Sequence, residues 1–360
     1  MSDSLTPVDS HRLRNLVERI LQFHGVPPDE AAIVADVLVC ADLRGVDSHG
    51  VARLDRYYVG RLRKGLIPPK SPASVVRESP TTALIDAGNG LGAVAAKGAM
   101  ELCLRKAQTA GMAAVTVSHS NHFGIAGYYA MMALPRGMIG VALTNASTTV
   151  APTYSRQRLL GTNPIAIAVP AGEERPFVLD MATTVAAEGK IEVKDRLGKP
   201  LPLGWIVDRE GLPTTDSRSF YDQGGALLPL GGDAEHAGYK GYGLSLAVDI
   251  LSGVLSGAGS SLGVLRSMAT QESAVNAGHF FAALRIDAFR DPDEFRAAMD
   301  RTLRTIRDSP KAAGAERVYI AGEKEFDTQD ERQRLGIPLL PVVVQMLQRL
   351  AAEAGTLYDL

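Results

Sequence analysis

Hydrophobic residues in the first part of the chain recur with the spacing of α-helices. Apolar positions three and four residues apart predict three helical stretches, over 11–24, 30–44 and about 47–65. Ser10 and Asp29 are residue types that cap helices, and Gly25 and Gly45 would end the first two. The segment 66–72 contains three prolines and breaks the pattern, which indicates a domain boundary.

From about residue 75 the chain changes to short runs rich in β-branched residues. Turn residues separate five such runs, which predicts strands over 81–87, 112–118, 138–145, 164–171 and 176–182. Helical spacing returns between and after them, over 93–109, 124–135 and 241–256. The two periods together predict a mixed α/β (α+β) fold for residues 75–285.

The C-terminal part is helical again, over 291–310 and 341–354. We therefore expect residues 1–74 and 286–360 to pack together as one helical domain built from both chain ends. Residues 75–285 would then be a central α/β domain inserted between them. Ligands usually bind in clefts between such units.

Composition and charge narrow the classes of protein. The 360 residues carry 38 basic and 40 acidic side chains, which favours neither nucleic acid nor an anionic membrane as partner. The longest apolar run, from Gly241, is interrupted by Asp249 and fits a buried helix better than a membrane span. Cys40 and Cys103 lie in helical patterns and are expected to be free thiols. The polar start of the sequence predicts a cytoplasmic enzyme.

The segment from Gly88 to Ala93 has the form of a dinucleotide-binding fingerprint. Its sequence GNGLGA follows an apolar run and precedes a helical pattern, as in the motif G-x-G-x-x-A. That fingerprint also needs an acid at the end of the next strand, to bind ribose hydroxyls. The next strand ends in residues 118–122, SHSNH, and has no acid. We therefore interpret these glycines as a tight strand-to-helix turn.

A more informative segment is RGVDSHGVARLDRYY. If Asp47 or Ser48 caps a helix that begins near His49, then His49, Arg53 and Arg56 fall on one face. Arginine binds a carboxylate with two parallel hydrogen bonds, and a histidine at a helix N-terminus has a lowered pKa but still exchanges protons. The pattern suits a small carboxylate beside a group that moves a proton. The alternative is a plain helix cap with solvated arginines.

His119 and His122 lie where a predicted strand ends and a helix begins. They could form half of a metal site, but no Cys, Asp or Glu lies nearby in the sequence. The backbone around Gly124 and Gly127 could instead bind phosphates at the helix start, or the segment could be a polar loop.

Three further polar residues lie beside predicted strand ends or glycine turns. Asp180 could bind ribose hydroxyls, although on the sequence alone an ordinary helix cap is the better explanation. Lys240 lies between glycines at a helix start, as in anion sites, and Glu323 lies on a glycine turn after an apolar run.

Eight segments, taken in order, resemble the type-2 malate/L-lactate dehydrogenase family across nearly the whole chain. They are DSHGVARL, NHFGIAGYYA, GTNPIAIAVP, FVLDMATT, GKPLPLGWIVD, GYKGYGLSLAVDILSGVLSGA, GHFF and RVYIAGEKE. The family also includes ureidoglycolate, sulfolactate and diketogulonate enzymes and a cyclic-imine reductase.

The resemblance implies an NAD(P)-dependent oxidoreductase that interconverts a small 2-oxo acid and its 2-hydroxy acid. A cyclic-imine reductase or a ureidoglycolate dehydrogenase is the alternative. It also implies a non-Rossmann fold, in which NAD or NADP binds to a central mixed sheet. The helical domain would then lie on the substrate and dimer side. A homodimer without metal is implied as well.

The resemblance further assigns roles to residues. His49 would be the acid/base group with Ser48 as its relay, although some members use the histidine at the position of His122. Arg53 and Thr162 would contact the substrate. Lys190 favours an oxo acid, because the imine reductase has an acid there, but it could be a surface lysine. The cofactor contacts would be His122, Phe123, Gly124, Ile125, Ala126, Asp180, Met181, Ala182, Lys240, Gly241, Gly322, Glu323 and Lys324.

Overall fold

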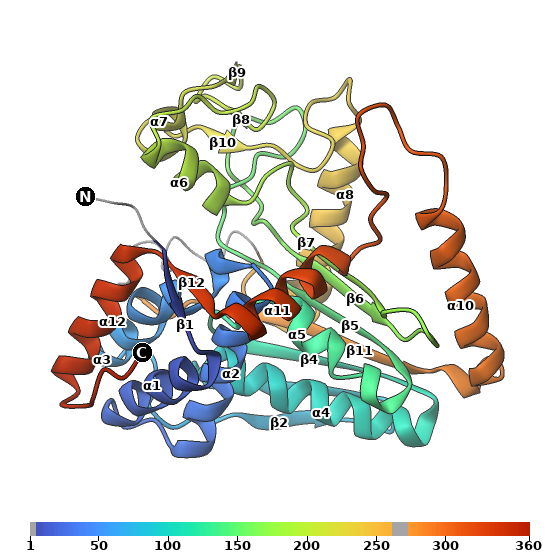
Figure 1. Ribbon diagram of the computed structural model, residues 1–360, viewed down its shortest axis with the longest axis horizontal. Coiled ribbons are helices and arrows are strands. Elements are labelled where there is room, and N and C mark those ends of the chain that lie inside the picture. Colours follow the sequence, from blue (N-terminus) through green and yellow to red (C-terminus); the bar gives the residue numbers. More distant parts are fainter. Residues whose placement is uncertain (1–4, 261–272) are drawn as a thin grey trace.

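The centre of the molecule is a seven-stranded mixed sheet (Figure 1). Its strands are, in spatial order, β2 (Ser74–Glu78), β3 (Thr82–Asp86), β4 (Met112–Ser120), β11 (Ala277–Arg285), β5 (Met138–Thr144), β6 (Ile165–Val169) and β7 (Phe177–Met181). Strands β3 and β4 pair in parallel and the other neighbours in this sheet are antiparallel. The structure is a computed structural model that describes residues 5–260 and 273–360.

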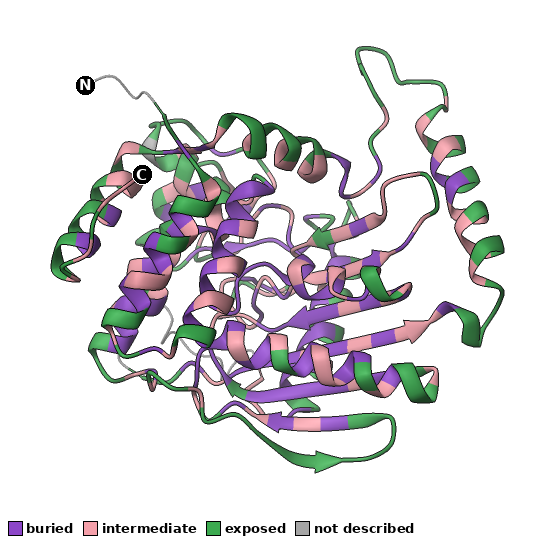
Figure 2. Cartoon of the chain, turned by 60° about the horizontal axis from the view of Figure 1, so that its bottom comes forward, coloured by how far each residue is buried: buried purple, intermediate pink, exposed green. Residues whose placement is uncertain are grey.

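The five predicted strands are confirmed as β3 to β7, but β2 and β11 were not predicted. The sequence of β11, AGHFFAALR, has two phenylalanines but no valine, isoleucine or threonine, so it lacks the β-branched residues by which the other strands were predicted. It nevertheless pairs with both β4 and β5 in the middle of the sheet. Strand β2 is exposed along its whole length at the edge of the sheet, as the strand coloured green in Figure 2 shows.

Helices cover both faces of the sheet. On one face α4 (Gly92–Ala110) packs against β4 and β11, and α5 (Ala126–Met131) packs against β5 and β6. On the other face lie α8 (Gly238–Asp249) and the π-helix η5 (Ile250–Val254). The neighbouring backbones are so close there that a Cβ on Gly278 would lie 1.9 Å from the carbonyl oxygen of Ser252. Successive side chains of a strand point to opposite faces of the sheet, and Phe281 of β11 belongs to the main core instead.

The two chain ends meet at one side of the sheet. Strand β1 (Thr6–Val8) pairs with β12 (Ile337–Leu339), and α1 (Ser10–Phe23) contacts both α2 (Pro28–Leu43) and α12 (Pro341–Glu353). Helix α11 (Glu323–Leu335) precedes β12 and contacts α2. Helix α10 (Pro292–Arg307), by contrast, lies beside the loop between β6 and β7 at the other side of the molecule (Figure 1).

One hydrophobic core joins these parts. The largest cluster of buried apolar residues includes side chains of α1, α2, α4, α12 and the sheet, such as Leu16, Leu38, Met100, Phe281 and Leu350. Burying such side chains away from water is the main driving force for folding. The division into a helical domain and a central α/β domain stays a prediction.

A smaller lobe above the sheet was not predicted as a separate unit. It contains α6 (Glu188–Arg196), α7 (Ser217–Tyr221) and a three-stranded sheet of β10 (Ala226–Leu227), β8 (Ile206–Val207) and β9 (Pro213–Thr214). Its own core includes Val150, Ile191, Ile206, Phe220 and Leu227. In Figure 1 this lobe stands above the sheet and faces α11.

Two predicted helix caps were wrong. Asp9, not Ser10, caps α1, since its carboxylate accepts hydrogen bonds from the backbone of residues 11 and 12. Helix α2 begins at Pro28 rather than after Asp29, because proline fits the first turn of a helix, where its missing N–H is not needed.

The predicted third helix is broken into several short elements. They are the 3₁₀-helices η1 (Asp47–His49) and η2 (Val51–Arg53), the π-helix η3 (Leu54–Val59) and α3 (Gly60–Arg63). Two further 3₁₀ turns are η4 (Leu134–Arg136) and η6 (Ile286–Ala288). Within residues 5–260 and 273–360, no helix combines the length and apolar character that crossing a membrane requires.

Candidate active site

A cavity of about 960 Å³ lies between the upper lobe, the sheet and the segment that contains His49. Most of the predicted site residues line it: Ser48, His49, Arg53, His122, Phe123, Gly124, Ile125, Ala126, Thr162, Asp180, Met181, Ala182, Gly322 and Lys324. These residues are up to 276 positions apart in the sequence, from 48 to 324, so the fold itself assembles the cavity.

At one end of the cavity, Ser48 and His49 lie on the short turn η1. The Ser48 hydroxyl is 2.9 Å from Nδ1 of His49, and the backbone carbonyl of Ser48 accepts a hydrogen bond from Nε of Arg53. The guanidinium of Arg53 stacks over the ring of Tyr57, with 5.4 Å from its central carbon to the ring centroid. We name residues 47–53 the catalytic turn.

The catalytic turn is fixed from below by a buried acid. Asp42, at the end of α2, accepts a hydrogen bond from the backbone N–H of Val51 at 2.8 Å. A Cβ on Gly50 would lie only 1.8 Å from Oδ1 of Asp42, so the turn has room for glycine alone at this position. Burial raises the pKa of Asp42 well above its usual value. The glycine in the segment DSHG is thus explained by close packing.

The residues that were predicted to share one helix face do lie together, but not on a regular helix. Ser48, His49, Arg53 and Arg56 all line the cavity, although no regular α-helix carries them. Burial lowers the pKa of His49 to about 4, and the neighbouring Arg53 contributes. The predicted direction was right, but the cause is burial and a nearby cation rather than a helix dipole, because η1 has only three residues.

His122 lies directly beside His49 in the cavity. Their rings are stacked with centroids 5.6 Å apart, and the ring of Tyr57 lies 5.0 Å from that of His122. The backbone N–H of Gly124 donates to Nδ1 of His122 at 3.3 Å, and the Tyr58 hydroxyl lies 3.3 Å from the same nitrogen. Because a backbone N–H can only donate, the ring proton of neutral His122 is on Nε2. Burial keeps the pKa of His122 well below its usual value.

The opposite end of the cavity holds charged groups of both signs. Asp180, on β7, accepts the backbone N–H of Gly127 at 2.7 Å. Burial raises the pKa of Asp180 to about 6. The hydrogen bond from Gly127 and the charge of the buried Arg44 lower this pKa but only partly offset the rise. Gly322 adopts a positive φ of +95°, and Glu325 lies nearby on α11. We name this region the Asp180 end, and the region around His49 the His49 end.

Four predicted site residues lie outside the cavity lining. Lys190 is exposed on α6, and Gly189 beside it lines the cavity instead; a Cβ on Gly189 would lie 3.0 Å from Cβ of Ser48. Lys240 is exposed at the start of α8, and Gly241 packs tightly against the backbone of Leu230. Their sequence suggested an anion site, but α8 begins away from the cavity.

Glu323, the fourth, is buried in a network of ion pairs with Arg307 and Arg317 rather than facing the cavity. Its neighbours Gly322 and Lys324 do line it. The helix that begins here turns alternate side chains in different directions, which the sequence pattern could not resolve.

Other lining residues were missed by sequence reasoning. His279 is buried beneath Phe123 with ring centroids 4.5 Å apart, and it bridges the hydroxyls of Ser120 and Thr144 at 2.8 and 2.7 Å. Asn145 also lines the cavity. His279 lies on β11, the unpredicted strand, although the segment GHFF contains it; the histidine in an apolar run was the available signal.

The glycine-rich segment after β3 is a strand-to-helix turn, as predicted. Strand β3 ends at Asp86 and α4 begins at Gly92, and the segment is absent from the cavity lining. A Cβ on Gly92 would lie 2.2 Å from the carbonyl oxygen of Asn121, so close packing requires this glycine. The side chain of Asn121 donates to the carbonyl oxygens of Asn89 and Gly90 and fixes the turn.

His119 and His122 do not share a site. His119 is exposed and pairs with Asp86 at 3.1 Å, whereas His122 lines the cavity. Across the described residues, no three His, Cys, Asp or Glu side chains come together as metal ligands would. Cys40 and Cys103 are both free thiols.

The cavity offers groups that an elongated polar ligand could use. Asn121 Oδ1 and Thr149 Oγ1 are buried in lining residues without a hydrogen-bond partner in the described part of the chain. Buried polar atoms normally have partners, so these two fit an amide or hydroxyl of a ligand. Gly124 and Gly322, both with positive φ, allow close approach to the backbone. These observations fit a dinucleotide with a carboxamide ring.

A model of the malate/L-lactate dehydrogenase family matches residues 8–348. The malate dehydrogenase of Pyrococcus horikoshii is 47% identical over 350 residues, which cover 97% of this chain and 95% of that protein. A structure of malate dehydrogenase from P. horikoshii superposes with a TM-score of 0.90 at 44% identity, over 99% of this chain and 97% of that one.

Two relatives with other activities are also similar. The L-sulfolactate dehydrogenase of Methanocaldococcus jannaschii is 39% identical, and the alignment covers 95% of this chain and 95% of that protein. The structure of a Δ1-piperideine-2-carboxylate reductase from Pseudomonas syringae has a TM-score of 0.84 at 29% identity, with 96% of this chain and 100% of that one covered.

The fold and these relatives thus define an oxidoreductase. The chain belongs to the malate/L-lactate dehydrogenase family. Dehydrogenases of this family use a nicotinamide cofactor, and the cavity described above has groups that suit one.

Proposed function

We propose that this protein is an NAD- or NADP-dependent dehydrogenase that interconverts a small 2-oxo acid and its 2-hydroxy acid. The observation that carries the proposal is the placement of His49 and Arg53 on one wall of the cavity, joined through Ser48. This reaction needs a group that exchanges a proton with the substrate oxygen and a cation for the carboxylate.

His49 would be the group that exchanges this proton. If its Nδ1–H donates to the Ser48 hydroxyl, Nε2 keeps a lone pair and can accept the proton of a 2-hydroxy acid. Its low pKa keeps the ring neutral and ready to act as a base. His122, which carries its proton on Nε2, would donate a hydrogen bond to the same oxygen.

Arg53 would bind the substrate carboxylate. Its Nε is held by the Ser48 carbonyl and its plane lies over Tyr57, so the orientation of its guanidinium is defined before substrate binds. Thr162 lines the same cavity and would contact the substrate as well.

The nicotinamide cofactor supplies the hydride when the acid is reduced and accepts it when the acid is oxidised. Asn121 and Thr149 would bind its amide end, and Gly124, Asp180, Gly322 and the residues next to them would bind the remainder. The ionised Asp180 carboxylate would accept hydrogen bonds from ribose hydroxyls.

A panel of 2-oxo acids and cyclic imines, each with NADH and with NADPH, tests this proposal. We expect oxidation of a reduced cofactor, followed by nicotinamide absorbance, with at least one small 2-oxo acid such as oxaloacetate or pyruvate. The same panel identifies the preferred cofactor. Turnover of cyclic imines alone would overturn the assignment of the substrate, and absence of cofactor binding would overturn the function.

A cyclic imine is the second candidate because of one acid in the cavity. Glu188, at the start of α6, lines the cavity and lies within electrostatic reach of Arg53 and Arg56. A carboxylate there could stabilise a positively charged iminium. The variant Glu188→Gln separates the two candidates. It should slow the reduction of a cyclic imine and leave the rate of reduction of a 2-oxo acid unchanged. The opposite result would exclude the imine.

We further propose that the protein is a homodimer that uses the outer face of α8 and η5. Leu244, Ile250 and Val254 are 44%, 48% and 60% exposed there, and no charged side chain lies among residues 241–248 or 250–258. Apolar patches of this kind usually mark an interface. Ile250→Glu should therefore shift the mass in light scattering from dimer to monomer, while Leu212→Glu, on an exposed loop elsewhere, should not. A dimer that survives Ile250→Glu would exclude this face.

A further inference from the structure

Helix α11 connects the two ends of the cavity. Its first residues, Lys324 and Glu325, line the Asp180 end together with the turn at 319–322. Near its C-terminus, Arg332 reaches the catalytic turn at the His49 end. Both ends of one continuous helix of 13 residues are therefore attached to the cavity.

The C-terminal attachment is an ion pair with the residue next to Ser48. Arg332 pairs with both carboxylate oxygens of Asp47, and Nη1 also donates to the backbone carbonyl of Asp42. The Arg332 side chain is only 14% exposed, so water competes weakly for it. Asp47 is thereby held against the end of α2, and Ser48 and His49 follow it directly in the chain.

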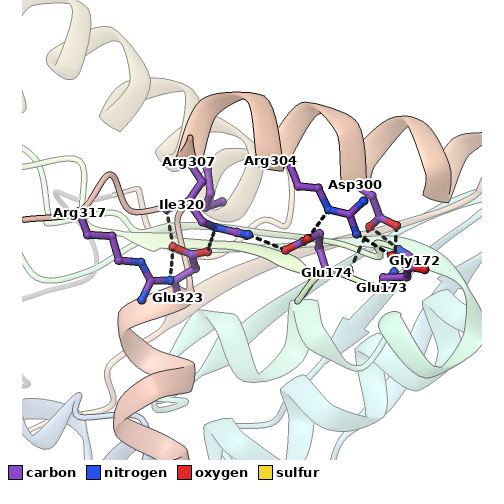
Figure 3. A network of polar contacts seen from close by, with 9 residues as sticks. All are labelled: Gly172, Glu173, Glu174, Asp300, Arg304, Arg307, Arg317, Ile320 and Glu323. Atoms are coloured by element: carbon purple, nitrogen blue, oxygen red, sulfur yellow. Dashed lines mark hydrogen bonds and ion pairs between the residues drawn. The ribbon is translucent and has the colours of Figure 1, made fainter. Parts of the chain in front are cut away.

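The N-terminal attachment is the network in Figure 3. Glu323 is 4% exposed and accepts hydrogen bonds from Nε of Arg307 and the backbone N–H of Ile320, at 2.9 and 3.0 Å, and it forms an ion pair with Arg317 at 2.9 Å. Arg307 continues to Glu174, which also pairs with Arg304. The turn at 319–322 is thus tied through α10 to the loop between β6 and β7.

The middle of α11 is held against α2. The guanidinium of Arg44 lies 4.5 Å from the ring centroid of Phe326 and donates to Gln329 at 3.2 Å. Thr328 approaches Gly45 so closely that a Cβ there would lie 3.0 Å from its methyl group. A helix that is fixed at both ends and in the middle is a rigid support, which holds each end of the cavity through its own attachment.

We infer that α11 sets the position of the catalytic turn relative to the opposite end of the cavity, with Arg332 as the positioning residue for Ser48 and His49. Arg332 acts through Asp47 and touches no reacting atom. Glu323 acts in the same way on the turn at 319–322. The inference rests on the proposed function, because it assigns the proton transfer to one end and the cofactor's remaining contacts to the other.

Two variants should separate these roles. Arg332→Gln should lower kcat about tenfold, because a small displacement of an acid/base group costs much of its effect. The dissociation constant of NADH, measured by fluorescence titration, should stay within about twofold of the parent value. Glu323→Gln should do the reverse: weaken NADH about tenfold and leave kcat at saturating NADH within about twofold.

Matched variants exclude a general loss of structure. Arg334→Gln, on the same helix but exposed, should leave kcat and NADH binding unchanged. Arg332→Lys should recover part of kcat, because one ammonium can pair with Asp47 but cannot reproduce the fork. Asp47→Asn, at a side chain that is 55% exposed, should lower kcat like Arg332→Gln, and the double variant should be no worse than either.

Several outcomes would overturn the inference. Additive losses of kcat in the double variant would show that Arg332 and Asp47 act separately. An unchanged kcat in Arg332→Gln would show that Arg332 does not position Ser48 and His49. If Arg332→Gln does not fold, Asp47→Asn alone decides, and wild-type kcat in that variant would refute the inference. If the parent protein does not bind NADH or NADPH, the proposed function fails instead, so the two failures are distinguishable.

Discussion

The two ends of the cavity respond to the same burial with opposite chemistry. At the His49 end burial acts on bases, so the pKa of His49 falls to about 4 and that of His122 lies well below its usual value. At the Asp180 end it acts on an acid, so the pKa of Asp180 rises to about 6. In each case the uncharged form gains.

This comparison of the two ends shows which charged side chains of the cavity remain available to bind ligands. Arg53 lines one end and Arg44 the other, and each presents a guanidinium group. Both ends thus offer a fixed cation beside groups that can change their protonation. An anionic substrate and an anionic cofactor can each find a permanent partner, while the neighbouring titratable groups are free to exchange protons.

The largest expected effect is at the His49 end. His49→Ala should lower kcat/KM for the 2-oxo acid about a thousandfold, because general acid/base catalysis contributes roughly 10² to 10⁴. Steady-state kinetics with either reduced cofactor measures this. His119→Ala, at an exposed histidine outside the cavity, is the control and should behave like the parent. If His122→Ala loses far more activity than His49→Ala, the roles of the two rings are exchanged.

A somewhat smaller loss is expected for the cation at the same end. Arg53→Ala should raise KM for the acid about a hundredfold, since hydrogen bonds to charged groups contribute about 1.5–3 kcal/mol each. Arg53→Lys should restore little, because an ammonium lacks the planar fork. In oxidation of the hydroxy acid, which needs a neutral His49, removing Arg53 should also move the acidic limb of the pH profile to higher pH, because its charge lowers the pKa of His49. A KM equal to that of the parent would remove Arg53 from substrate binding.

At the Asp180 end, backbone geometry provides a sharper probe than charge. A Cβ on Gly322 would lie 3.0 Å from Val178, in a conformation with φ +95° that disfavours side chains. Gly322→Ala should therefore weaken NADH binding about tenfold by displacing this turn, with little change in kcat at saturation. Gly314→Ala has a similar φ of +80° but open space around it, and should bind NADH normally. Equal effects of the two variants would attribute the loss to backbone strain alone.

The smallest effect concerns stability and pH. The folded-state pKa of Asp180 lies above that of the unfolded chain, so the stability it contributes is present in acid and is lost as pH rises through about 6. Asp180→Asn should thus gain stability relative to the parent between about pH 4 and 7, by less than about 1 kcal/mol because the carboxylate faces the cavity and its shift is screened. Urea unfolding at both pH values measures this, with Asp330→Asn on the surface as control. A difference that shrinks as pH rises would contradict the sign.

Sequence patterns located the His49 end better than they described it. The spacing of His49, Arg53 and Arg56 predicted a shared face, and all three line the cavity, but on a broken segment rather than one helix. Asp42 and Gly50 explain why the segment is broken, and their contact depends on the packing of α2, which no local pattern contains. The five predicted strands were found because they are rich in β-branched residues. Strand β11 was missed because it has none.

The Asp180 end was harder to foresee because its residues come from several distant segments. Asp180 and Gly322 line the cavity as expected, whereas Glu323 turns into the network with Arg307 and Arg317. One position along a new helix separates a lining residue from a buried one. Residues Lys240 and Gly241 shared the glycine pattern of an anion site, but α8 starts elsewhere in the fold.

The neutral ring of His49 beside Arg53 has a calorimetric consequence. A carboxylate that binds to Arg53 brings a negative charge close to the imidazole and raises its pKa. Binding of the acid should then draw a fraction of a proton from the buffer, and the measured heat should depend on the ionisation enthalpy of that buffer. In the direction of reduction, the protein would thus take up a proton as the oxo acid binds, and that proton would pass to the substrate oxygen and leave with the hydroxy acid.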